Sequence, residues 1–262
     1  MLNKLYPTLL KIVANSVHSE NFTLTFHANA FAMPPFYIDK IITLFLNRFA
    51  HLSPYFDHFV YMLAENKLLK GGLVLAVFYL LWFQQKDYRK RLIITFMASF
   101  VAEVATIILS LTLPFRARPY TDTDIVFNEP VKVDHWWNNA ISSFPSDHAT
   151  MFTVLGIGVF ICNRKIGSYV IGYILIFILA PRLYLGLHYF TDLVSGALIG
   201  MIMVWISFQL RHVKKVAAFI EQFADQKPQY FYPMLFLITY QLVDLFTESR
   251  EILGFIRHPF KY

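Results

Sequence analysis

Three short polar clusters hold the side chains of this chain that are best suited to chemistry. They are Arg116-Ala117-Arg118-Pro119, then Phe144-Pro145-Ser146-Asp147-His148-Ala149, then the stretch from Arg182 to Asp192. The mainly polar stretch 120–143 separates the first two, and long apolar stretches separate the second from the third. Arginine forks bind planar oxyanions, and imidazoles act as nucleophiles or as general acids and bases. Together the clusters favour chemistry on an oxyanion such as a phosphoryl group.

His188 and Asp192 in the third cluster stand four residues apart, which places them on one face of a helix. A carboxylate that binds one ring nitrogen fixes the imidazole tautomer and leaves the other nitrogen as a nucleophile. The same pair could equally be an ion pair that closes a helix end. Spacing alone leaves both interpretations open.

His148 and Ser146 begin the apolar stretch that follows the second cluster, so they mark a predicted helix N-terminus. Such a terminus offers free N–H groups and a positive dipole end to an anion, and Ser146 can add its hydroxyl. Capping alone would explain Ser146 but gives no reason for His148. Arg118 and Arg182 offer planar forks to phosphate oxygens. Contact with lipid headgroups is the alternative, and it suits Arg116 better than Arg182, which lies among apolar residues.

The composition indicates a membrane protein. Of 262 residues, 56% are hydrophobic and 15% are charged, against about 25% charged in soluble domains. The net charge of +6 falls in short basic clusters between apolar stretches, which fits lipid headgroups better than nucleic acid. The single cysteine, Cys162, excludes an internal disulfide. Polar residues soon break the first apolar stretch, so no signal peptide is predicted.

We predict an all-α fold, a polytopic helical membrane bundle of about six transmembrane helices preceded by N-terminal amphipathic helices. The predicted spans cover about residues 68–83, 92–113, 148–162, 167–185, 191–210 and, more weakly, 230–246. Residues 36–64 alternate apolar and polar side chains, which predicts one or two interfacial helices. The chain then divides into an interfacial segment (1–66), a transmembrane bundle (67–247) and a C-terminal tail (248–262). Gly196 and Gly200 would let a neighbouring helix approach closely.

The basic residues predict the orientation of this bundle. The connections after the first, third and fifth predicted spans hold Lys86, Arg89, Lys90, Arg91, Arg164, Lys165, Arg211, Lys214 and Lys215. Basic loops face the cytoplasm under the positive-inside rule. The three polar clusters then share the opposite face, where they could form one site. The basic C-terminal tail departs from this pattern if the sixth helix spans the membrane.

The three clusters resemble the signature of the type 2 phosphatidic acid phosphatase superfamily, whose pattern is Lys-x6-Arg-Pro, then Pro-Ser-x-His, then Ser-Arg-x5-His-x3-Asp. The matching positions are Arg118-Pro119, residues 145–148, and Arg182, His188 and Asp192 at the family spacings. The resemblance covers about residues 50–210. Each motif is weak by itself, but three in order form a strong signature. Two positions depart from it, because Leu111 replaces the family lysine and Pro181 replaces the serine.

The resemblance implies a reaction through a phosphohistidine. His188 would be the nucleophile, Asp192 would orient it, and His148 would protonate the leaving oxygen and then activate water. The implied phosphate-binding groups are Arg118, Arg182, Ser146, the backbone N–H of Asp147 and, as a partial substitute for the missing lysine, Arg116. Clustered arginines can stand where other enzymes place Mg²⁺. The sequence shows no Cys/His metal-ligand cluster, so we expect neither a metal nor a cofactor.

Within this family, the Pro-Ser-Asp-His motif, the short chain and the outward-facing site look most like bacterial undecaprenyl diphosphatases. The resemblance implies hydrolysis of undecaprenyl diphosphate to undecaprenyl phosphate and phosphate. It also implies a multi-pass protein of the bacterial cytoplasmic membrane whose active site faces the extracytoplasmic side. Phosphatidylglycerophosphate, phosphatidic acid and lipid A phosphates are alternative substrates. The expected partners are the lipid substrate and membrane lipids, and no nucleic acid.

Two other classes of function stay open. A transporter or channel would line a pathway with Arg182, His188 and Asp192, although such proteins usually carry broken helices near the midplane and often repeats. A non-catalytic lipid-binding or scaffold protein is suggested by Leu111, because a missing cation removes one stabilising donor. Vanadate-dependent haloperoxidases share the three-part motif, but they are soluble, and the composition argues against them.

Overall fold

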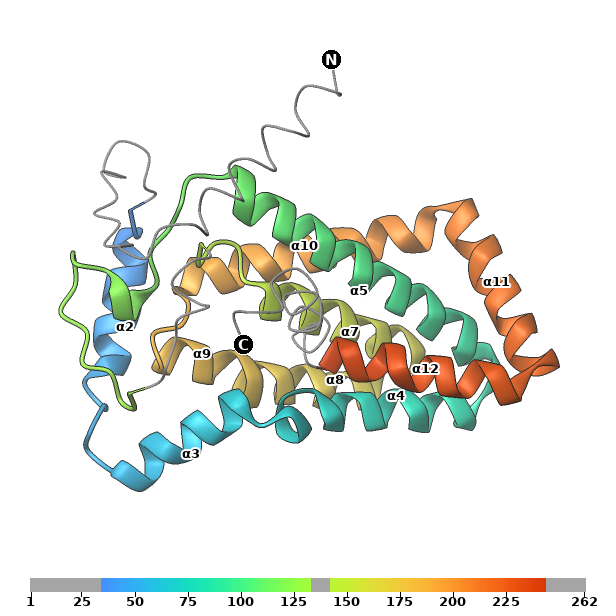
Figure 1. Cartoon of the computed structure of the whole chain (residues 1–262), viewed down its shortest axis with the longest axis horizontal. Helices are drawn as coiled ribbons and strands as arrows, with labels where there is room; N and C mark the ends of the chain where they lie inside the picture. The colour runs from blue at the N-terminus through green and yellow to red at the C-terminus, as the bar shows by residue number, and fades with distance from the viewer. Residues whose placement is uncertain (1–33, 133–141, 244–262) are drawn as a thin grey trace, which may run out of the picture. The chain divides into compact units, whose positions relative to one another are not determined.

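The computed structural model describes residues 34–132 and 142–243, which fall within one compact unit of the chain. This part of the chain is all-helical (Figure 1). Its α-helices are α2 (Tyr37–Asn47), α3 (Pro54–Glu65), α4 (Leu73–Gln84), α5 (Lys86–Thr112), α7 (Asp147–Cys162), α8 (Arg164–Tyr173), α9 (Ala180–Tyr184), α10 (Phe190–Gln209), α11 (Arg211–Gln226) and α12 (Pro228–Val243). The π-helical turns Leu68–Gly72 and Ile174–Leu179 precede α4 and α9. The predicted all-α class is confirmed for these residues.

Helix α7 is the centre of the bundle and packs against α5, α8 and α10 (Figure 1). Apolar residues lie on all of its sides, which is the pattern of a helix that is buried all round. Met151, Phe152 and Val154 are among its buried side chains. Gly158 lies so close to α5 that a Cβ there would be 2.2 Å from the Thr95 side chain. Small residues thus allow the tight spacing of the central helices.

Two glycines bring α10 against α7. A Cβ at Gly196 would lie 2.4 Å from the carbonyl oxygen of Ser146, and one at Gly200 would lie 2.6 Å from that of Thr150. The close approach predicted from their spacing is therefore confirmed. It holds the start of α7 against the first turns of α10.

Three helical stretches are long and apolar enough to cross a membrane, namely Lys86–Thr112, Arg164–Tyr184 and Phe190–Gln209. A fourth is reached if Pro54–Glu65 and Leu68–Gln84, which meet at an angle of 60°, form one broken span. The described residues thus hold three or up to four such helices, where the sequence predicted about six. Helix α7 is apolar but has only 16 residues, against about 20 for a straight crossing. The last predicted span ends outside the described residues.

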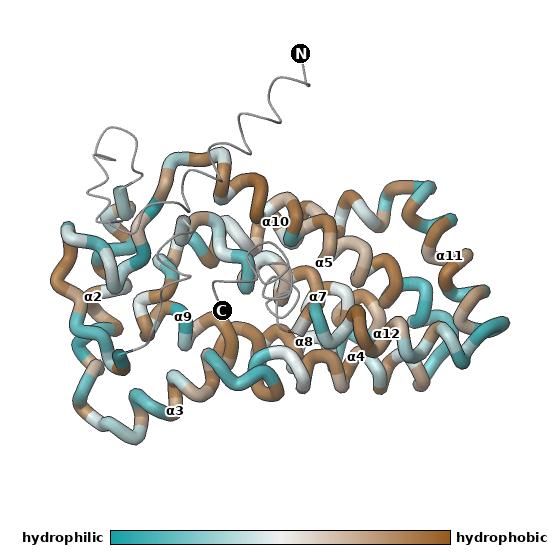
Figure 2. The backbone as a smooth tube through the Cα atoms, viewed as in Figure 1, coloured by the Kyte–Doolittle hydropathy of each residue, from teal (hydrophilic) through white to brown (hydrophobic). Residues whose placement is uncertain are grey.

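The long helices consist largely of apolar residues (Figure 2). Exposed large side chains include Phe100 and Ile108 on α5, Ile202 and Trp205 on α10, and Phe236 on α12. Soluble monomers rarely expose contiguous apolar surface on this scale, whereas lipid covers it. The surface therefore fits a protein that sits in a bilayer.

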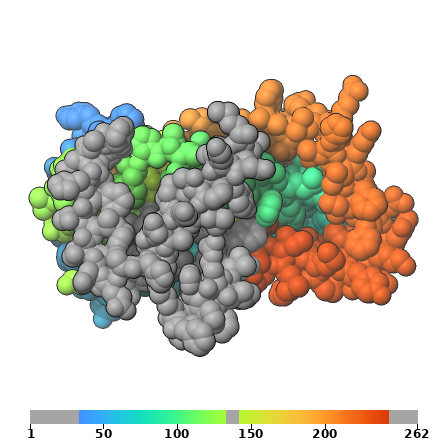
Figure 3. Space-filling view, turned by 45° about the horizontal axis from the view of Figure 1, so that its top comes forward, coloured from blue at the N-terminus to red at the C-terminus, as the bar shows by residue number. Residues whose placement is uncertain are grey.

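The helices run back and forth, so the polar clusters and the basic connections separate to opposite ends of the bundle (Figure 1). Helices α5 and α9 end, and α7 and α10 begin, at the end where α2 lies. The starts of α5 and α8 and the whole of α11 lie at the other end, where Figure 3 shows α11 beside α12. The basic residues at 86–91, 164–165 and 211–215 are therefore at the α11 end.

Helix α11 was not predicted, because its basic residues were interpreted as part of a connection after the fifth predicted span. In the structure it is an amphipathic helix that folds back against α5. Arg89 of α5 binds Asp225 of α11 at 2.9 Å and lies over the ring of Trp82. The basic segment after α10 is therefore ordered as a helix at the end of the bundle.

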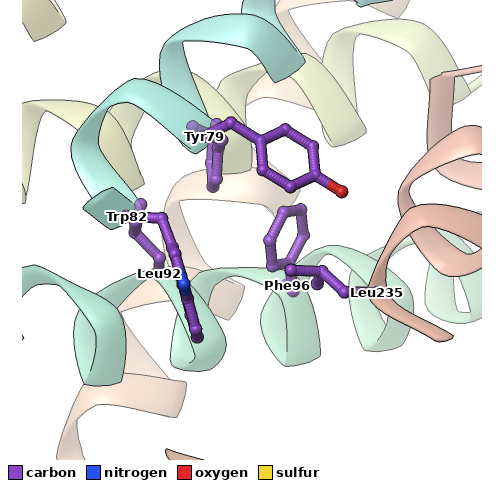
Figure 4. A pocket seen from close by; sticks show the side chains of 6 residues that line it. Tyr79, Trp82, Leu92, Phe96 and Leu235 are labelled. Carbon is purple, nitrogen blue, oxygen red and sulfur yellow. The ribbon is translucent and has the colours of Figure 1, made fainter. Parts of the chain in front are cut away.

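Helix α12 closes a small apolar hollow against α4 and α5 (Figure 4). It is lined by Phe78, Tyr79, Trp82, Leu92, Phe96 and Leu235. Its volume of about 10 Å³ is near the lower limit for one water. The polar atoms of Tyr79 and Trp82 bond to the hydroxyls of Thr239 and Tyr232 on α12. The hollow is a packing gap rather than a binding site.

The stretch 36–64 forms two helices, α2 and α3, as predicted. Helix α2 has an inverted pattern, since Asp39, Thr43 and Asn47 are buried while Ile38 and Ile41 are about half exposed. A water-facing amphipathic helix would bury its apolar side instead. The pattern fits a helix with a polar inner face and a lipid-facing outer face, and its place at the membrane interface stays a prediction.

Candidate active site

The three polar clusters meet at the α2 end of the bundle. Arg118 follows α5, His148 lies in the first turn of α7, and His188 directly precedes α10. One ring nitrogen of His148, one of His188 and a carboxylate oxygen of Asp147 all lie within 4.8 Å of one another. Two imidazoles from segments far apart in the sequence therefore share one site.

The His188 ring is almost fully buried and has a defined orientation. Its Nδ1 lies 2.9 Å from the Ser143 carbonyl oxygen, and its Nε2 lies 3.5 Å from a guanidinium nitrogen of Arg118. A carbonyl oxygen only accepts hydrogen bonds, so this partner assigns the proton to Nδ1 and the lone pair to Nε2. The ring thus turns its unprotonated nitrogen towards Arg118.

The surroundings of His188 favour its neutral form. Burial is the largest effect and lowers the pKa of His188 below its ordinary value of 6.5, with Asp192 and Asp147 acting to raise it and Arg118 to lower it. A lowered pKa leaves the imidazole neutral at pH 7. Neutral imidazole is the form that attacks an electrophile, so the ring is suited to a nucleophilic role.

Asp192 is fully buried and has several partners. Its Oδ2 accepts a hydrogen bond of 2.8 Å from the Tyr189 N–H at the start of α10, and its Oδ1 accepts one from Arg116. The carboxylate lies 3.8 Å from Nδ1 of His188. The sequence predicted that Asp192 would bind this nitrogen, whereas in the structure the Ser143 carbonyl holds the hydrogen bond. Asp192 acts on the ring through its nearby charge.

His148 is held between a carboxylate and an arginine. Its Nδ1 lies 2.8 Å from Oδ1 of Asp147, and its Nε2 lies 2.8 Å from Nη2 of Arg182. Arginine only donates, so Nε2 accepts and Nδ1 donates to Asp147. The sequence argument used only the backbone N–H of Asp147. Adjacent helical residues do not normally face each other, so their spacing does not signal this contact. The Asp147 carboxylate is therefore a site residue that sequence reasoning missed.

Arg182 joins this site to α3. Its Nη2 also donates a hydrogen bond of 3.0 Å to the carbonyl oxygen of Ala64, near the end of α3. Carbonyl groups in the last turn of a helix have no partner within the helix. The buried Nε of Arg182 has no hydrogen-bond partner among the residues that the structure describes. The guanidinium is thus fixed on one side and has donor capacity left on another.

Ser146 caps α7, as the capping interpretation predicted. Its Oγ accepts from the Ala149 N–H at 3.3 Å, and its own N–H donates to the Asp192 carbonyl oxygen at 3.1 Å. As an acceptor in the cap, the hydroxyl still has its own proton to donate. Asp147 is the first helical residue and presents its N–H at the same terminus. Capping and anion binding are therefore compatible here.

A cavity of about 230 Å³ opens beside these groups. Its lining includes Thr106, Ser110 and Leu111 of α5 together with Arg118, Asp147 and His188. A water molecule takes about 30 Å³ in the liquid, so the cavity has room for a group the size of a phosphate. Leu111, at the position of the family lysine, is 75% exposed and adds no charge to the α5 wall.

Arg116, like Ser146, His148 and Arg182, is not among the residues that line this cavity, but it also lies away from the two imidazoles. Its side chain is fully buried between two carboxylates, with Nη1 bound to Asp192 and Thr191 and Nη2 bound to Asp39 of α2. Its guanidinium carbon also lies 4.5 Å from the centre of the Tyr189 ring. The predicted secondary role in phosphate binding is therefore not favoured by its position. Arg116 supports Asp192 instead.

The donor atoms of Asp147, His148 and His188 lie close enough together to hold a metal ion. Asp147 and His148 already bind each other, and Arg182 occupies the remaining nitrogen of His148. A metal ion bound to His148 would have to replace either its hydrogen bond with Asp147 or its hydrogen bond with Arg182. The expectation of metal-independent chemistry stays a prediction, which a chelator can test.

Comparison with known proteins agrees with the geometry. The profile of the PAP2 superfamily matches residues 87–215, from the start of α5 into α11. The chain is also similar to the bacitracin transport permease protein BcrC of Bacillus licheniformis, at 27% identity over 170 residues, which are 62% of this chain and 77% of that protein. No solved structure gives a significant match. The chain therefore belongs to the PAP2 superfamily and is a multi-pass membrane protein with the fold of that family of phosphatases.

Proposed function

We propose that the protein hydrolyses the terminal phosphate of a lipid diphosphate, undecaprenyl diphosphate being the substrate we favour, through a phosphohistidine on His188. One observation supports this above the others. Two imidazoles lie within 4.8 Å of each other, and each has its Nε2 beside an arginine, Arg118 for His188 and Arg182 for His148. Nucleophile, proton carrier and cations are then in one place.

In the first step, Nε2 of His188 attacks the terminal phosphorus. A P–N bond forms while the P–O bond to the lipid phosphate breaks, and a protonated His148 gives its proton to the leaving oxygen. The Ser143 carbonyl oxygen and the charge of Asp192 stabilise the Nδ1–H of the resulting phosphoimidazolium. In the second step, His148 takes a proton from water, the water oxygen attacks phosphorus, and the P–N bond breaks, which releases phosphate and returns His188 to its neutral form.

Four groups would hold the transferring oxygens: Arg118, Arg182, the Ser146 hydroxyl and the Asp147 N–H. Phosphoryl transfer depends mainly on positioning and charge neutralisation, so these donors can provide most of the catalysis. Arg182 would turn from His148 to a phosphoryl oxygen when substrate binds, which frees Nε2 of His148 for its proton.

The lipid would reach the cavity from the bilayer. Leu111 at the cavity rim and the exposed apolar face of α5 provide an apolar approach for an isoprenoid chain. The Pro-Ser-Asp-His motif and the short chain support undecaprenyl diphosphate. Phosphatidylglycerophosphate, phosphatidic acid and lipid A phosphates offer the same phosphoryl chemistry and are the alternatives.

The basic connections at the α11 end support a cytoplasmic position for that end. The site would then face the extracytoplasmic side of the bacterial cytoplasmic membrane. Six crossings result if the broken pair α3–α4, then α5, α7, α8–α9, α10 and α12 each cross once. The short α7 would do so within the ring of longer helices.

Transport is the second candidate function, because the similar protein BcrC is named a bacitracin transport permease protein. Arg118, Arg182 and the two clustered imidazoles lie at one end of the bundle rather than along a path through it. This arrangement favours hydrolysis. Flux of bacitracin or of a lipid phosphate across liposomes without phosphate release would favour transport.

The decisive assay measures phosphate release from undecaprenyl diphosphate by the detergent-purified protein in EDTA. We expect activity in the wild type and its loss in His188→Ala, with an acid-labile phosphate trapped on the wild type. His212→Ala is the matched control, because this exposed histidine lies on α11 at the opposite end. Silence of the wild type on several lipid phosphates would favour the scaffold. Activity that requires added metal would contradict the metal-independent mechanism.

A further inference from the structure

Helix α2 lies outside the segment matched by the PAP2 profile, yet one of its side chains reaches the active-site end. Asp39 is fully buried and accepts hydrogen bonds from Arg116, from the Thr191 N–H at 2.9 Å and from the Thr191 hydroxyl at 2.7 Å. Asn47, two turns further along α2, exchanges hydrogen bonds of 2.7 and 2.8 Å with the backbone of Asn128. Helix α2 is thus fixed by polar contacts to the segments around the site.

Asp39 begins a chain of buried charges that ends at His188. Asp39 binds Arg116, Arg116 binds Asp192, and Asp192 lies 3.8 Å from Nδ1 of His188. The first three side chains are fully inaccessible to solvent. Charges inside a protein act on one another more strongly than in water. The negative charge of Asp39 therefore offsets part of the electrostatic effect that the positive charge of Arg116 has on Asp192 and its surroundings.

We propose that Asp39 is a positioning residue for the nucleophile, which it supports through Arg116 and Asp192. The inference rests on the proposed role of His188. Asp39 anchors Arg116, so that Arg116 holds Asp192 and the start of α10 in place. The negative charge of Asp39 also offsets the positive charge of Arg116. The negative charge of Asp192 can then act on the His188 ring.

The sign of the electrostatic effect follows from all the charges around His188. Arg118 faces Nε2, Asp192 faces Nδ1, and Asp147 and His148 lie across the site. Arg116 and Asp39 stand behind Asp192. Replacing Asp39 by asparagine adds one net positive charge to this group, so protonation of His188 becomes harder. The pH at which the nucleophile loses its proton then moves down.

The test compares Asp39→Asn with a buried carboxylate elsewhere on the same N-terminal helices. Asp57 of α3 is 1% exposed and binds the His51 N–H and the Tyr184 hydroxyl, which are both outside the chain of charges from Asp39 to His188. Asp57→Asn therefore removes a similar buried charge and serves as the matched control. Asp39→Glu keeps the charge and tests partial rescue.

We expect Asp39→Asn to lower kcat by about 10- to 100-fold, the loss that a displacement of about 1 Å can cause, with KM within about twofold of the wild type. The acid limb of kcat/KM should move down by about one pH unit, as one unit charge at about 10 Å would produce. Asp39→Glu should recover part of kcat and keep the wild-type midpoint. Asp57→Asn should also keep that midpoint. An unchanged kcat and midpoint in Asp39→Asn, or an equal shift in Asp57→Asn, would overturn the proposal.

A second measurement separates this inference from the proposed function. The rate at which diethyl pyrocarbonate modifies His188, followed by peptide mass spectrometry across pH, reports its neutral fraction without turnover. If the wild type hydrolyses no lipid phosphate, the proposed function fails, and a lower modification midpoint in Asp39→Asn still supports the coupling. Equal midpoints overturn it. If Asp39→Asn does not fold, Asp39→Asn/Arg116→Gln removes both charges, and its midpoint should be at or above that of the wild type. A lower midpoint there also overturns the proposal.

Discussion

Replacing Gly196 by alanine should separate the two halves of the active site. The new Cβ would lie 2.4 Å from the Ser146 carbonyl oxygen, whereas ordinary contact begins at 3.4 Å, so a gap of 3.4 − 2.4 = 1.0 Å must open. The obstacle is backbone, so no side chain can rotate away to relieve it. The hydrogen bond of 3.1 Å from the Ser146 N–H to the Asp192 carbonyl oxygen spans the same contact and would break.

A displacement of about 1 Å between reacting groups can cost about 100-fold in rate. We expect Gly196→Ala to lower kcat for undecaprenyl diphosphate by about 10- to 100-fold, measured by phosphate release. Gly200→Ala needs a smaller opening of 3.4 − 2.6 = 0.8 Å against Thr150 and lies one turn further from the site. Its loss of kcat should therefore be smaller.

Gly172 of α8 is the matched control, because a Cβ there would meet nothing within 4 Å. Gly172→Ala should keep the wild-type kcat and raise the free energy of unfolding by up to about 1 kcal/mol through helix propensity. Thermal melting in detergent checks that the variants are folded. A Gly196→Ala protein with kcat within twofold of the wild type would refute the argument, as would an equal loss of kcat in Gly172→Ala.

Three further outcomes follow from the site. Because the pKa of His188 is lowered and its neutral form attacks, kcat/KM should fall as pH drops through a midpoint below 6.5; a midpoint above 7 in the pH profile would contradict this. Arg182→Ala should lower kcat by about 10²- to 10³-fold, and Arg182→Lys should recover only part, since an ammonium lacks the planar guanidinium, whose Nη2 binds both His148 and Ala64 while its Nε has no partner among the described residues; full recovery of the turnover rate by lysine would count against this argument. Leu111→Lys adds a cation at the cavity rim and should lower KM for the diphosphate severalfold; an unchanged or higher KM would show that the rim does not meet the phosphate.

The sequence predicted the long elements and the meeting of the motifs well, for physical reasons. Long apolar stretches without charges have few structures available other than helices in a bilayer, so α5, α7 and α10 were found close to their observed bounds. The ends of successive antiparallel helices alternate between the two faces, so polar clusters that two crossings separate lie on the same face, and His148 and His188 could therefore be placed together. Their catalytic roles stay proposals.

The contacts that hold the site residues in place could not be predicted from the sequence. The acceptor for Nδ1 of His188 is the main-chain carbonyl of Ser143, and every residue has such a group, so no residue type signals it. Asp39 reads as an exposed charge on an amphipathic helix, and only the packing of α2 shows it to be buried. The break after α3 was also missed as part of a span, although Asn66 and the pair Gly71–Gly72 mark an interrupted helix.

The interruption between α3 and α4 has a consequence for Arg182. In an uninterrupted helix, the Ala64 oxygen would accept the N–H four residues ahead and would be less available to a side chain from another helix. The 60° bend exposes that oxygen, and Arg182 uses it as a tether. Straightening the two segments into one rod would release the tether and leave the guanidinium its contact with His148. The bend between α3 and α4 therefore helps to set the direction in which the Arg182 guanidinium points.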